Sequence, residues 1–300
     1  MAGLSGKPPL RIGLLTCTPL PEPDHDERPT IEAFAAAGHL AEPVAWNTAP
    51  DLSRFDACLL RATWDYFADL RRFLSWLEAA ARQTRVLNTL DIVRWNHHKG
   101  YLLELHARSV PTIPTVLARK GEAVDVEAVA ARRGWQQGVV VKPAIGAGSF
   151  QTRRFAPEEL ADAQRFAAEL GQSGDVLVQP VASGFADPGE RSLIWIDGAW
   201  THAIRKRPRY AGEDESVVAD TPATAEERAI GERAIAAAPS RPLYARLDVV
   251  RGDPNTGSAG EAILVSELEM IEPSLFFFCE GGAAAAKKLV QATERAVGSG

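Results

Sequence analysis

Cysteine is scarce in this chain, with three residues in 300, and methionine is scarcer still, with two. Cys17, Cys58 and Cys279 lie far apart in the sequence and form no Cys-x-x-Cys pair. Disulfide frameworks and structural zinc sites both need paired or closely spaced cysteines, so we expect neither. We interpret the three thiols as small buried side chains of a protein from a reducing, cytoplasmic compartment.

The chain also has no excess of positive charge and no long apolar run. Its 33 Lys and Arg residues and 39 Asp and Glu residues give a formal net charge of −6, which is not the basic footprint of a nucleic-acid-binding protein. No stretch has the length of a membrane span, and the first residues contain no apolar signal-peptide core. We therefore expect a cytoplasmic protein whose partner is a small molecule, with no nucleic acid or membrane partner, acting alone or as a homo-oligomer.

The common short motifs of nucleotide-binding and hydrolytic enzymes are missing as well. There is no GxxxxGK[ST] loop, no GxGxxG after the first apolar strand, no GxSxG elbow and no HExxH pair. These absences exclude a P-loop enzyme, a dinucleotide-binding domain, an α/β-hydrolase and a zinc protease of the usual kinds.

Strands and helices alternate in the first third of the chain. Apolar runs predict strands over 11–17, 44–47, 56–63 and 86–88, and helical spacing predicts helices over 27–37 and 67–81. This alternation is typical of a parallel sheet, so we predict an α/β protein with a Rossmann-like first lobe over residues 1–95. We expect a helix from Trp95 to Leu105, a central lobe over 96–185 and a C-terminal lobe over 186–300.

Ligands bind beyond the carboxyl ends of the strands in such a sheet. Arg61 and Thr63 lie at the carboxyl end of the third predicted strand, and Trp64, Asp65 and Tyr66 follow it. Arg61 could pair with an anionic group of a substrate, and the next residues could shape its pocket. For Trp64 and Tyr66, packing in the core or between lobes is an equally good interpretation.

A candidate phosphate site lies in the segment VVVKPAIGAGS. Three β-branched residues lead to Lys142 and then to a loop that contains Gly146, Gly148 and Ser149. Glycines let backbone N–H groups approach phosphate oxygens, and the lysine adds a positive charge. Lys99, before Gly100 at the start of a helix, could be a second phosphate ligand, although a solvated lysine is the ordinary interpretation.

Two further segments could contact a nucleotide. The strand VLVQPV could present the Gln179 amide and the Val181 backbone to a nucleobase, or it could simply end at Pro180. The basic run Arg205, Lys206, Arg207 and Arg209 lacks interleaved aromatic residues. An anion site for a triphosphate or a carboxylate therefore suits it better than nucleic acid.

Two apolar strands near the C-terminus carry charged residues at alternate positions. LYARLDVV places Arg246 and Asp248 on one face, and ILVSELEMIEP does the same for Glu267 and Glu269, with Glu272 beyond them. Burying several carboxylates is unfavourable unless cations compensate. Mg²⁺ prefers such oxygen ligands and leaves positions open for phosphates, so we interpret these carboxylates as metal ligands rather than as an acidic surface.

In this order the segments resemble the ATP-grasp superfamily over essentially the whole chain. The resemblance implies an ATP-grasp fold behind a pre-ATP-grasp lobe, with ATP and Mg²⁺ (or Mn²⁺) as cofactors. It implies roles for the residues named above: Lys99, Lys142, Gly146, Gly148 and Ser149 at the phosphates; Gln179, Pro180 and Val181 as the adenine hinge, with Glu190 near the ribose; Arg246, Arg207 and Lys206 in catalysis; Arg205 at the substrate; and Asp248 with two of Glu267, Glu269 and Glu272 at the metal. The chain departs from the usual Glu-x-Asn at the metal strand and from the more frequent Glu at the hinge.

Within the superfamily, the chain looks like the glutathione-synthetase-like ligases, and among these like the ligases that close O-ureido-D-serine to D-cycloserine. This narrower resemblance implies that ATP activates an amino-acid carboxylate as an acyl phosphate, which a nitrogen of the same molecule attacks. Two alternatives stay open: an intermolecular carboxylate–amine ligase, and a non-catalytic ATP-binding regulatory module.

Overall fold

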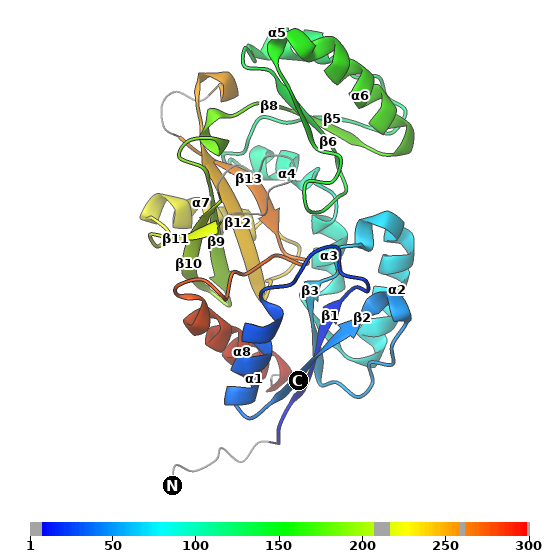
Figure 1. Ribbon diagram of the computed structural model, residues 1–300, viewed down its shortest axis with the longest axis vertical. Helices are drawn as coiled ribbons and strands as arrows, with labels where there is room; N and C mark the ends of the chain where they lie inside the picture. Colours follow the sequence, from blue (N-terminus) through cyan, green and yellow to red (C-terminus); the bar gives the residue numbers. More distant parts are fainter. Residues whose placement is uncertain (1–7, 207–216, 258–261, 299–300) are drawn as a thin grey trace.

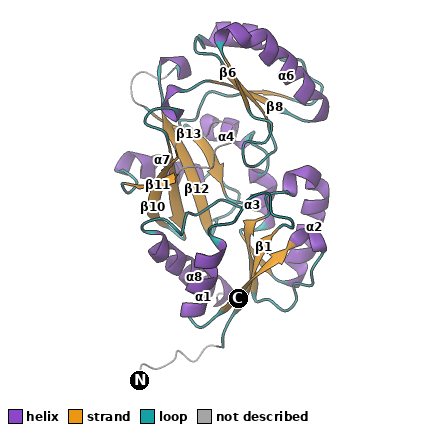
Figure 2. Cartoon of the chain, viewed as in Figure 1, coloured by secondary structure: helices purple, strands orange, loops and turns teal. Residues whose placement is uncertain are grey.

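The computed structural model describes residues 8–206, 217–257 and 262–298, which form three sheets with helices packed on them (Figures 1 and 2). The first sheet is parallel and has the strand order β2-β1-β3-β4, as the alternation of strands and helices predicts. Its elements are β1 (Arg11–Thr16), α1 (Glu27–Ala36), β2 (Leu40–Ala45), β3 (Ala57–Ala62), α2 (Leu70–Gln83) and β4 (Arg85–Leu87).

The second strand of this sheet ends earlier than we predicted. β2 stops at Ala45, and residues 46–48 form a short 3₁₀ turn. Trp46 begins that turn and is buried against the rings of Phe73 and Trp76. Packing of this large ring in the core of the first lobe therefore ends the extended backbone there.

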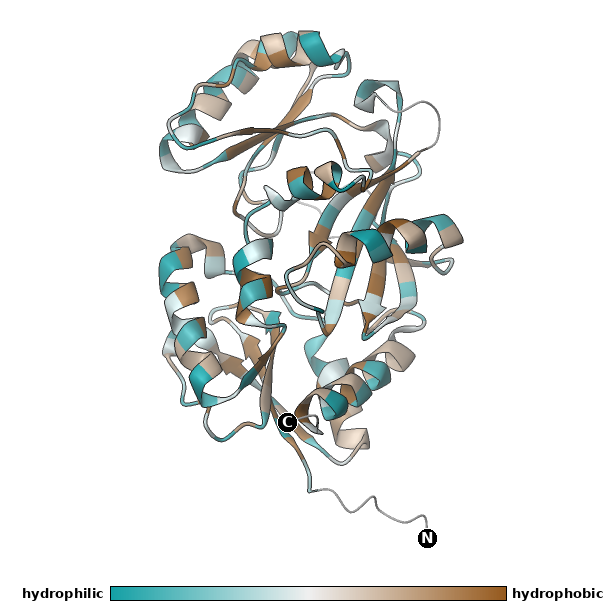
Figure 3. Ribbon diagram, turned by 180° about the vertical axis from the view of Figure 1, so that it is seen from behind, coloured by the Kyte–Doolittle hydropathy of each residue, from teal (hydrophilic) through white to brown (hydrophobic). Residues whose placement is uncertain are grey.

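The second sheet is antiparallel and forms the upper lobe in Figure 1, with the strand order β5-β8-β6-β7. Its strands and the two helices that cover it are β5 (Val116–Ala118), α5 (Val126–Arg133), β6 (Val139–Pro143), β7 (Arg153–Phe155), α6 (Leu160–Ser173) and β8 (Val176–Pro180). The two helices at the top of Figure 3 carry alternating hydrophobic and hydrophilic bands. Val129 and Phe166 lie in the apolar cluster that these helices form with the sheet.

The third sheet is antiparallel, with the strand order β11-β10-β9-β12-β13. Its elements are β9 (Glu190–Ile196), β10 (Ala199–Lys206), β11 (Val217–Asp220), α7 (Ala225–Ile235), β12 (Tyr244–Arg251), β13 (Ile263–Glu269) and α8 (Gly282–Gly298). Side chains such as Leu193 and Leu247 face α7, whereas Ile194 and Tyr244 face α8 and the first lobe. Strand alternation thus assigns each position of this sheet to one of two differently covered faces.

The predicted helix from Trp95 to Leu105 is wrong, because the chain bends within it. Two short helices, α3 (Leu90–Asn96) and α4 (Tyr101–Ala107), are separated by a turn. In this turn Gly100 N–H donates to His98 Nδ1 over 3.0 Å. The bend leaves Lys99 between the helices, and both helices pack on the third sheet through Ile92 and Leu102.

Among the described helices, none is long and apolar enough to cross a membrane.

Candidate active site

A β-bulge in the third sheet brings the acidic residues of β13 to one face. Asp248 of β12 pairs with Glu267, but the next residue, Val249, pairs with Val265, so Ser266 is the extra residue. A bulge shifts the alternation of side chains by one position. Val265 therefore packs into the core on the α7 side, while Glu267 faces the opposite side of the sheet, beside Asp248.

Three carboxylates converge there. One oxygen each of Asp248, Glu267 and Glu269 lies within 4.8 Å of the others. Among the described residues, this is the only group of three side chains of metal-ligating type that lie so close together. Burial, together with the negative charges of Glu267 and Asp248, raises the pKa of Glu269 to about 7. Three carboxylates with this mutual repulsion, Asp248 buried and the two glutamates half-buried, fit a divalent cation such as Mg²⁺. Glu272 lies outside the group, and burial followed by the charge of Glu269 raises its pKa to about 8.

Two lysines from different elements reach a single oxygen of Glu267. Lys99 Nζ is 2.9 Å from Oε1 and Lys142 Nζ is 3.4 Å from it. Burial disfavours the Glu267 carboxylate, but the two lysines outweigh it and hold its pKa well below the usual range. Burial likewise opposes the charge on Lys99, yet Glu267 raises the pKa of that lysine, whereas burial lowers the pKa of Lys142. The tighter pair is therefore Lys99 with Glu267.

The other side of the carboxylate group is bounded by Lys206 and Arg246. Arg246 donates from Nε to Asp248 Oδ1 over 2.9 Å and from Nη2 to Glu269 Oε1 over 2.6 Å. Lys206 Nζ lies 3.2 Å from Asp248 Oδ2 and 3.4 Å from Glu190 Oε2. We call the set formed by Lys99, Lys142, Lys206, Arg246, Glu190, Asp248, Glu267 and Glu269 the cation–carboxylate cluster.

The cluster joins parts of the chain that lie far apart in sequence. Glu190 accepts from Ser266 Oγ over 2.6 Å, which ties β9 to the bulge of β13. Burial raises the pKa of Glu190, against the effect of Lys206. Burial also disfavours the charged form of Asp248, but Arg246 and Lys206 lower its pKa below the ordinary value. Each buried charge thus has a partner of opposite sign, as burial requires.

Arg205 does not reach this cluster, which corrects our expectation for the basic run. Its Nη2 lies 2.7 Å from Asp220 Oδ2, and its Nη1 donates to the carbonyl oxygens of Pro188 and Gly189. Neighbours along a strand point to opposite faces, so Arg205 lies on the α7 side while Lys206 lies beside Asp248. Arg207 and Arg209 lie outside the described residues.

The strand predicted to form the adenine hinge is buried, and several of its hydrogen-bonding groups already have partners within the chain. Gln179 in β8 donates its side-chain amide to Thr115 Oγ1 over 2.9 Å. Val181 donates its N–H to the Gly138 carbonyl over 3.1 Å and accepts from Asn255 Nδ2 over 2.7 Å. Both backbone polar groups of Val181, which we expected to contact a nucleobase, thus have partners within the chain.

The glycine loop connects β6 to β7. Gly148 has a φ of 56° and Ser149 a φ of 60°, both in the left-handed region that favours glycine. Gly146 and Gly148 lie within ten residues of Lys142, the β6 residue that contacts Glu267. The loop therefore begins a few residues after a lysine that belongs to the cluster.

The residues after β3 divide into an inter-lobe set and a core set. Arg61 is 3 % exposed and its Nη2 lies 3.5 Å from Asp26 Oδ2. Arg61 Nη1 and Thr63 Oγ1 are buried with no hydrogen-bond partner among the described residues. Trp64 Nε1 donates to the Glu272 carbonyl over 3.2 Å, which joins the first lobe to the segment after β13.

Asp65 and Tyr66 serve the structure of the first lobe. Asp65 accepts from Trp46 Nε1 over 2.5 Å and from Asn47 Nδ2 over 2.9 Å. Tyr66 is 4 % exposed and lies within the apolar core of this lobe. Tyr66 thus packs in the core, which is one of the two interpretations that the sequence left open.

Asp26 is a residue that the sequence analysis missed. Its carboxylate accepts the backbone N–H groups of Leu275, Phe276 and Phe277 over 2.6, 3.0 and 2.6 Å. Phe276 has a φ of 53°, so these three N–H groups converge as a nest that binds an anion. Burial raises the pKa of Asp26, and the charge of Arg61 opposes this effect. In the sequence, a single aspartate before a helix gives no sign that its hydrogen-bond partners lie about 250 residues away, as those of Asp26 do.

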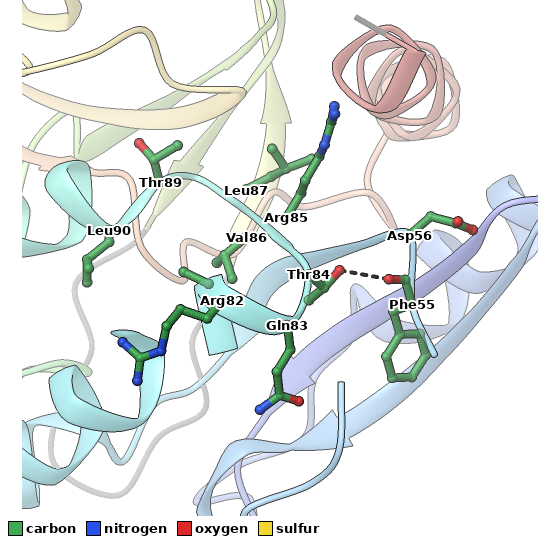
Figure 4. Close-up of a pocket in the computed structure, with 11 residues that line it drawn as sticks. Phe55, Asp56, Arg82, Gln83, Thr84, Arg85, Val86, Leu87, Thr89 and Leu90 are labelled. Atoms are coloured by element: carbon green, nitrogen blue, oxygen red, sulfur yellow. Dashed lines mark hydrogen bonds between the residues drawn. The ribbon is translucent and has the colours of Figure 1, made fainter. Parts of the chain in front are cut away.

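A separate cavity of about 570 Å³ lies at the outer edge of the first sheet (Figure 4). It is lined by Phe55, Asp56, residues 81–87, Thr89 and Leu90, and Thr84 Oγ1 donates to the Phe55 carbonyl within it. It shares no residue with the cation–carboxylate cluster, so it does not belong to the site.

Comparison with known proteins identifies the family. Residues 12–88 match the model of the N-terminal domain of the D-cycloserine synthetase DcsG. The cycloserine biosynthesis protein DcsG of Streptomyces lavendulae is 32 % identical over 278 residues, which cover 87 % of this chain and 91 % of the relative. This chain belongs to the DcsG family of ATP-grasp ligases.

The similarity to DcsG extends to the three-dimensional structure. The crystal structure of DcsG superposes with a TM-score of 0.83 at 29 % identity and covers 96 % of this chain and 99 % of that one. A D-alanine–D-alanine ligase from Bacillus anthracis shares the fold, with a TM-score of 0.65 at 16 % identity over 96 % of this chain and 97 % of its own. The protein is therefore an enzyme that forms a C–N bond, which excludes the non-catalytic ATP-binding module.

Proposed function

We propose that this ligase uses ATP and Mg²⁺, or Mn²⁺, to cyclise O-ureido-D-serine to D-cycloserine. The observation that carries the proposal is the cation–carboxylate cluster, in which three lysines and an arginine meet three carboxylates able to bind one metal. Phosphoryl transfer depends mainly on positioning and charge neutralisation, and this cluster offers both. The choice of substrate is supported by the 32 % identity to the cycloserine biosynthesis protein DcsG.

Asp248, Glu267 and Glu269 would hold the metal. Their chemistry fits, because a divalent cation would offset the repulsion that raises the pKa of Glu269 to about 7. When bound, the metal would neutralise charge on the ATP phosphates. Glu272 does not belong to this group of carboxylates, so it would lie at the edge of the site and not bind the metal.

The two lysines on Glu267 would bind the ATP phosphates. Lys99 and Lys142 share one carboxylate oxygen of Glu267. Phosphate oxygens offer them new partners, and the glycine loop at Gly146, Gly148 and Ser149 would add backbone N–H groups. On the opposite side, Lys206 and Arg246 would hold the substrate carboxylate against the transferring phosphoryl group, assisted by Arg207.

The adenine would lie against the end of β8. Gln179 and Pro180 end this strand, and Val181 can still contribute its apolar side chain. Glu190 lies beside Lys206 and Ser266 on the neighbouring sheet, where its carboxylate could accept from a ribose hydroxyl. The nucleotide would then lie between the second and third sheets, with its phosphates towards the cluster.

The amino-acid substrate would lie between the first lobe and the third sheet. Arg61 Nη1 and Thr63 Oγ1 are buried polar atoms without partners among the described residues, and such atoms are costly unless a ligand satisfies them. We propose that they bind the polar end of the substrate. Trp64, fixed to the Glu272 carbonyl, would form the wall of this pocket.

The reaction would proceed through an acyl phosphate. A carboxylate oxygen of the substrate attacks the γ-phosphorus, and ADP leaves. The nitrogen bonded to the side-chain oxygen then attacks the acyl carbon, phosphate leaves and that nitrogen loses its proton. The carbamoyl group is released as carbon dioxide and ammonia, so the net reaction consumes one ATP and one water. The nucleophile is tethered, so no second acceptor site is needed.

The test is incubation of the enzyme with O-ureido-D-serine, ATP and Mg²⁺, followed by mass spectrometry of the products. We expect D-cycloserine and ADP in equal amounts, and no product from Glu269→Gln. An intact O-ureido-D-serine, together with an amide formed from two separate amino acids, would favour the intermolecular ligase instead. Substitution of the L-enantiomer in the same assay tests the chirality.

A further inference from the structure

The tip of the glycine loop touches the first lobe through an aromatic contact. The rings of Phe150 and Phe67 have centroids 4.7 Å apart and an interplanar angle of 41°. Phe150 follows the glycine loop, and Phe67 lies in the 3₁₀ turn that precedes α2. Figure 1 shows the chain after β6 extending from the upper lobe towards the lobe that contains α2. Phe150 remains 44 % exposed, so the contact can open without disturbing a core.

The backbone of the loop is shaped to present Phe150. Gly148, Ser149 and Gln151 all have positive φ, at 56°, 60° and 48°. Phe150 N–H donates to the Ala147 carbonyl over 3.0 Å, which closes a tight turn. Two non-glycine residues in the left-handed region are unfavourable and persist where surrounding structure requires them. Ser149 and Gln151 directly flank Phe150, so these two left-handed residues set the course of the backbone at that ring.

The partner ring is held in place by a series of edge-to-face and tilted aromatic contacts. Phe67 contacts Tyr66 at 6.2 Å between centroids, Tyr66 contacts Phe73 at 5.3 Å, and Phe73 contacts Trp46 at 5.0 Å. Tyr66, Phe73 and Trp46 belong to the buried core of the first lobe. Phe150 therefore docks on the end of a rigid support.

The contact completes a ring of interactions around the cluster. Lys142, eight residues before Phe150, contacts Glu267, and Trp64, three residues before Phe67, donates to the Glu272 carbonyl. Glu267 lies in β13 and Glu272 in the segment that directly follows this strand. The third sheet, the central lobe and the first lobe are thus each joined to the next.

We propose that Phe67 and Phe150 form a latch that holds the glycine loop closed until the ligation is complete. The inference rests on the proposed function, because its benefit is protection of the acyl phosphate. If water attacks the acyl carbon, phosphate leaves and the carboxylic acid is regenerated, so ATP is hydrolysed without product. A closed loop excludes that water. An aromatic pair of this kind shifts the closed-to-open ratio by roughly two- to tenfold.

The experiment measures product formed per ADP released in Phe150→Ala, Phe67→Ala and the double variant. We expect each single variant to lower this ratio about two- to tenfold, and the double variant to lower it no further, because either change opens the same latch. Phe150→Tyr should restore it. Leu40→Ala, which truncates a 64 % exposed apolar side chain on the β2 edge, is the control and should match the wild type. An unchanged ratio in Phe150→Ala, or additive effects in the double variant, would overturn the proposal.

A second measurement separates this inference from the choice of substrate. Hydrogen exchange of residues 144–152 is followed in the presence of the non-hydrolysable analogue AMPPNP and Mg²⁺. We expect AMPPNP to slow exchange in the wild type and to slow it less in Phe67→Ala, although residue 67 belongs to another lobe. Equal protection in both proteins refutes the latch. If protection differs but O-ureido-D-serine is not converted, the latch stands and the proposed substrate is wrong.

Discussion

Replacing Asp26 with asparagine tests how the first lobe is fixed to the segment after β13. All of the hydrogen-bonding neighbours of this carboxylate are donors: the N–H groups of Leu275, Phe276 and Phe277 and the guanidinium of Arg61. An asparagine amide keeps the shape but turns one acceptor into a donor. Its NH₂ group must therefore face at least one N–H group, in either orientation.

The magnitude follows from these contacts. The most favourable orientation leaves one buried N–H unsatisfied, which costs about 1–3 kcal/mol. Burial already disfavours the charged form of Asp26 and raises its pKa, so loss of the charge opposite Arg61 adds little to this cost. We therefore expect a loss of about 1–3 kcal/mol. For a protein of this size that corresponds to a fall in Tm of roughly 2–8 °C.

The assay is thermal unfolding followed by fluorescence and by circular dichroism, since two probes reveal whether one lobe melts before the others. Glu32→Gln is the matched control on the same helix. It breaks the ion pair with Arg28, whose side chains are 87 % and 62 % exposed, and exposed pairs contribute little to stability. An Asp26→Asn variant that melts with the wild type would refute the reasoning.

Two further predictions concern the cluster itself. Lys142→Ala should weaken ATP binding by about 10- to 100-fold in calorimetry, because a charged donor to phosphate is lost. The control Lys120→Ala, which removes an exposed lysine, should bind ATP as the wild type does. Equal affinities for all three proteins would contradict the phosphate role of Lys142. Glu269→Gln should abolish turnover and keep the wild-type Tm, because a pKa of about 7 means that the fold already accepts a neutral group there. Metal binding requires the ionised form, so Mg²⁺ affinity of the wild type should rise as the pH passes through about 7, and a similar rise in Glu269→Gln would show that another group is responsible.

Much of the site could be predicted from the sequence because its residues lie on short strands with strong local patterns. The alternation of Arg246 with Asp248 places both on one face of β12, and the β-branched run before Lys142 predicts the strand that carries it. The alternating strands and helices of the first lobe likewise predict a parallel sheet. These are properties of neighbouring residues, so no knowledge of distant contacts is needed.

Other features depended on contacts between distant segments. The bend that places Lys99 between two helices lies inside a continuous helical pattern, and the bulge at Ser266 has no clear signature in its strand. The position of Arg205 was partly foreseeable, since Arg205 and Lys206 are neighbours and cannot face the same side of a strand.

Asp26 shows the limit most clearly, because its partners are backbone N–H groups at the other end of the chain. The sequence by itself thus determined which side chains share a face of each strand, together with the alternation that predicts the first sheet. Only the tertiary structure decided which faces meet, which lysine pairs most tightly with Glu267 and how the first lobe is anchored. The physical reason is that strand and helix periodicity is a local property, whereas pairing of buried charges depends on the packing of whole sheets against one another.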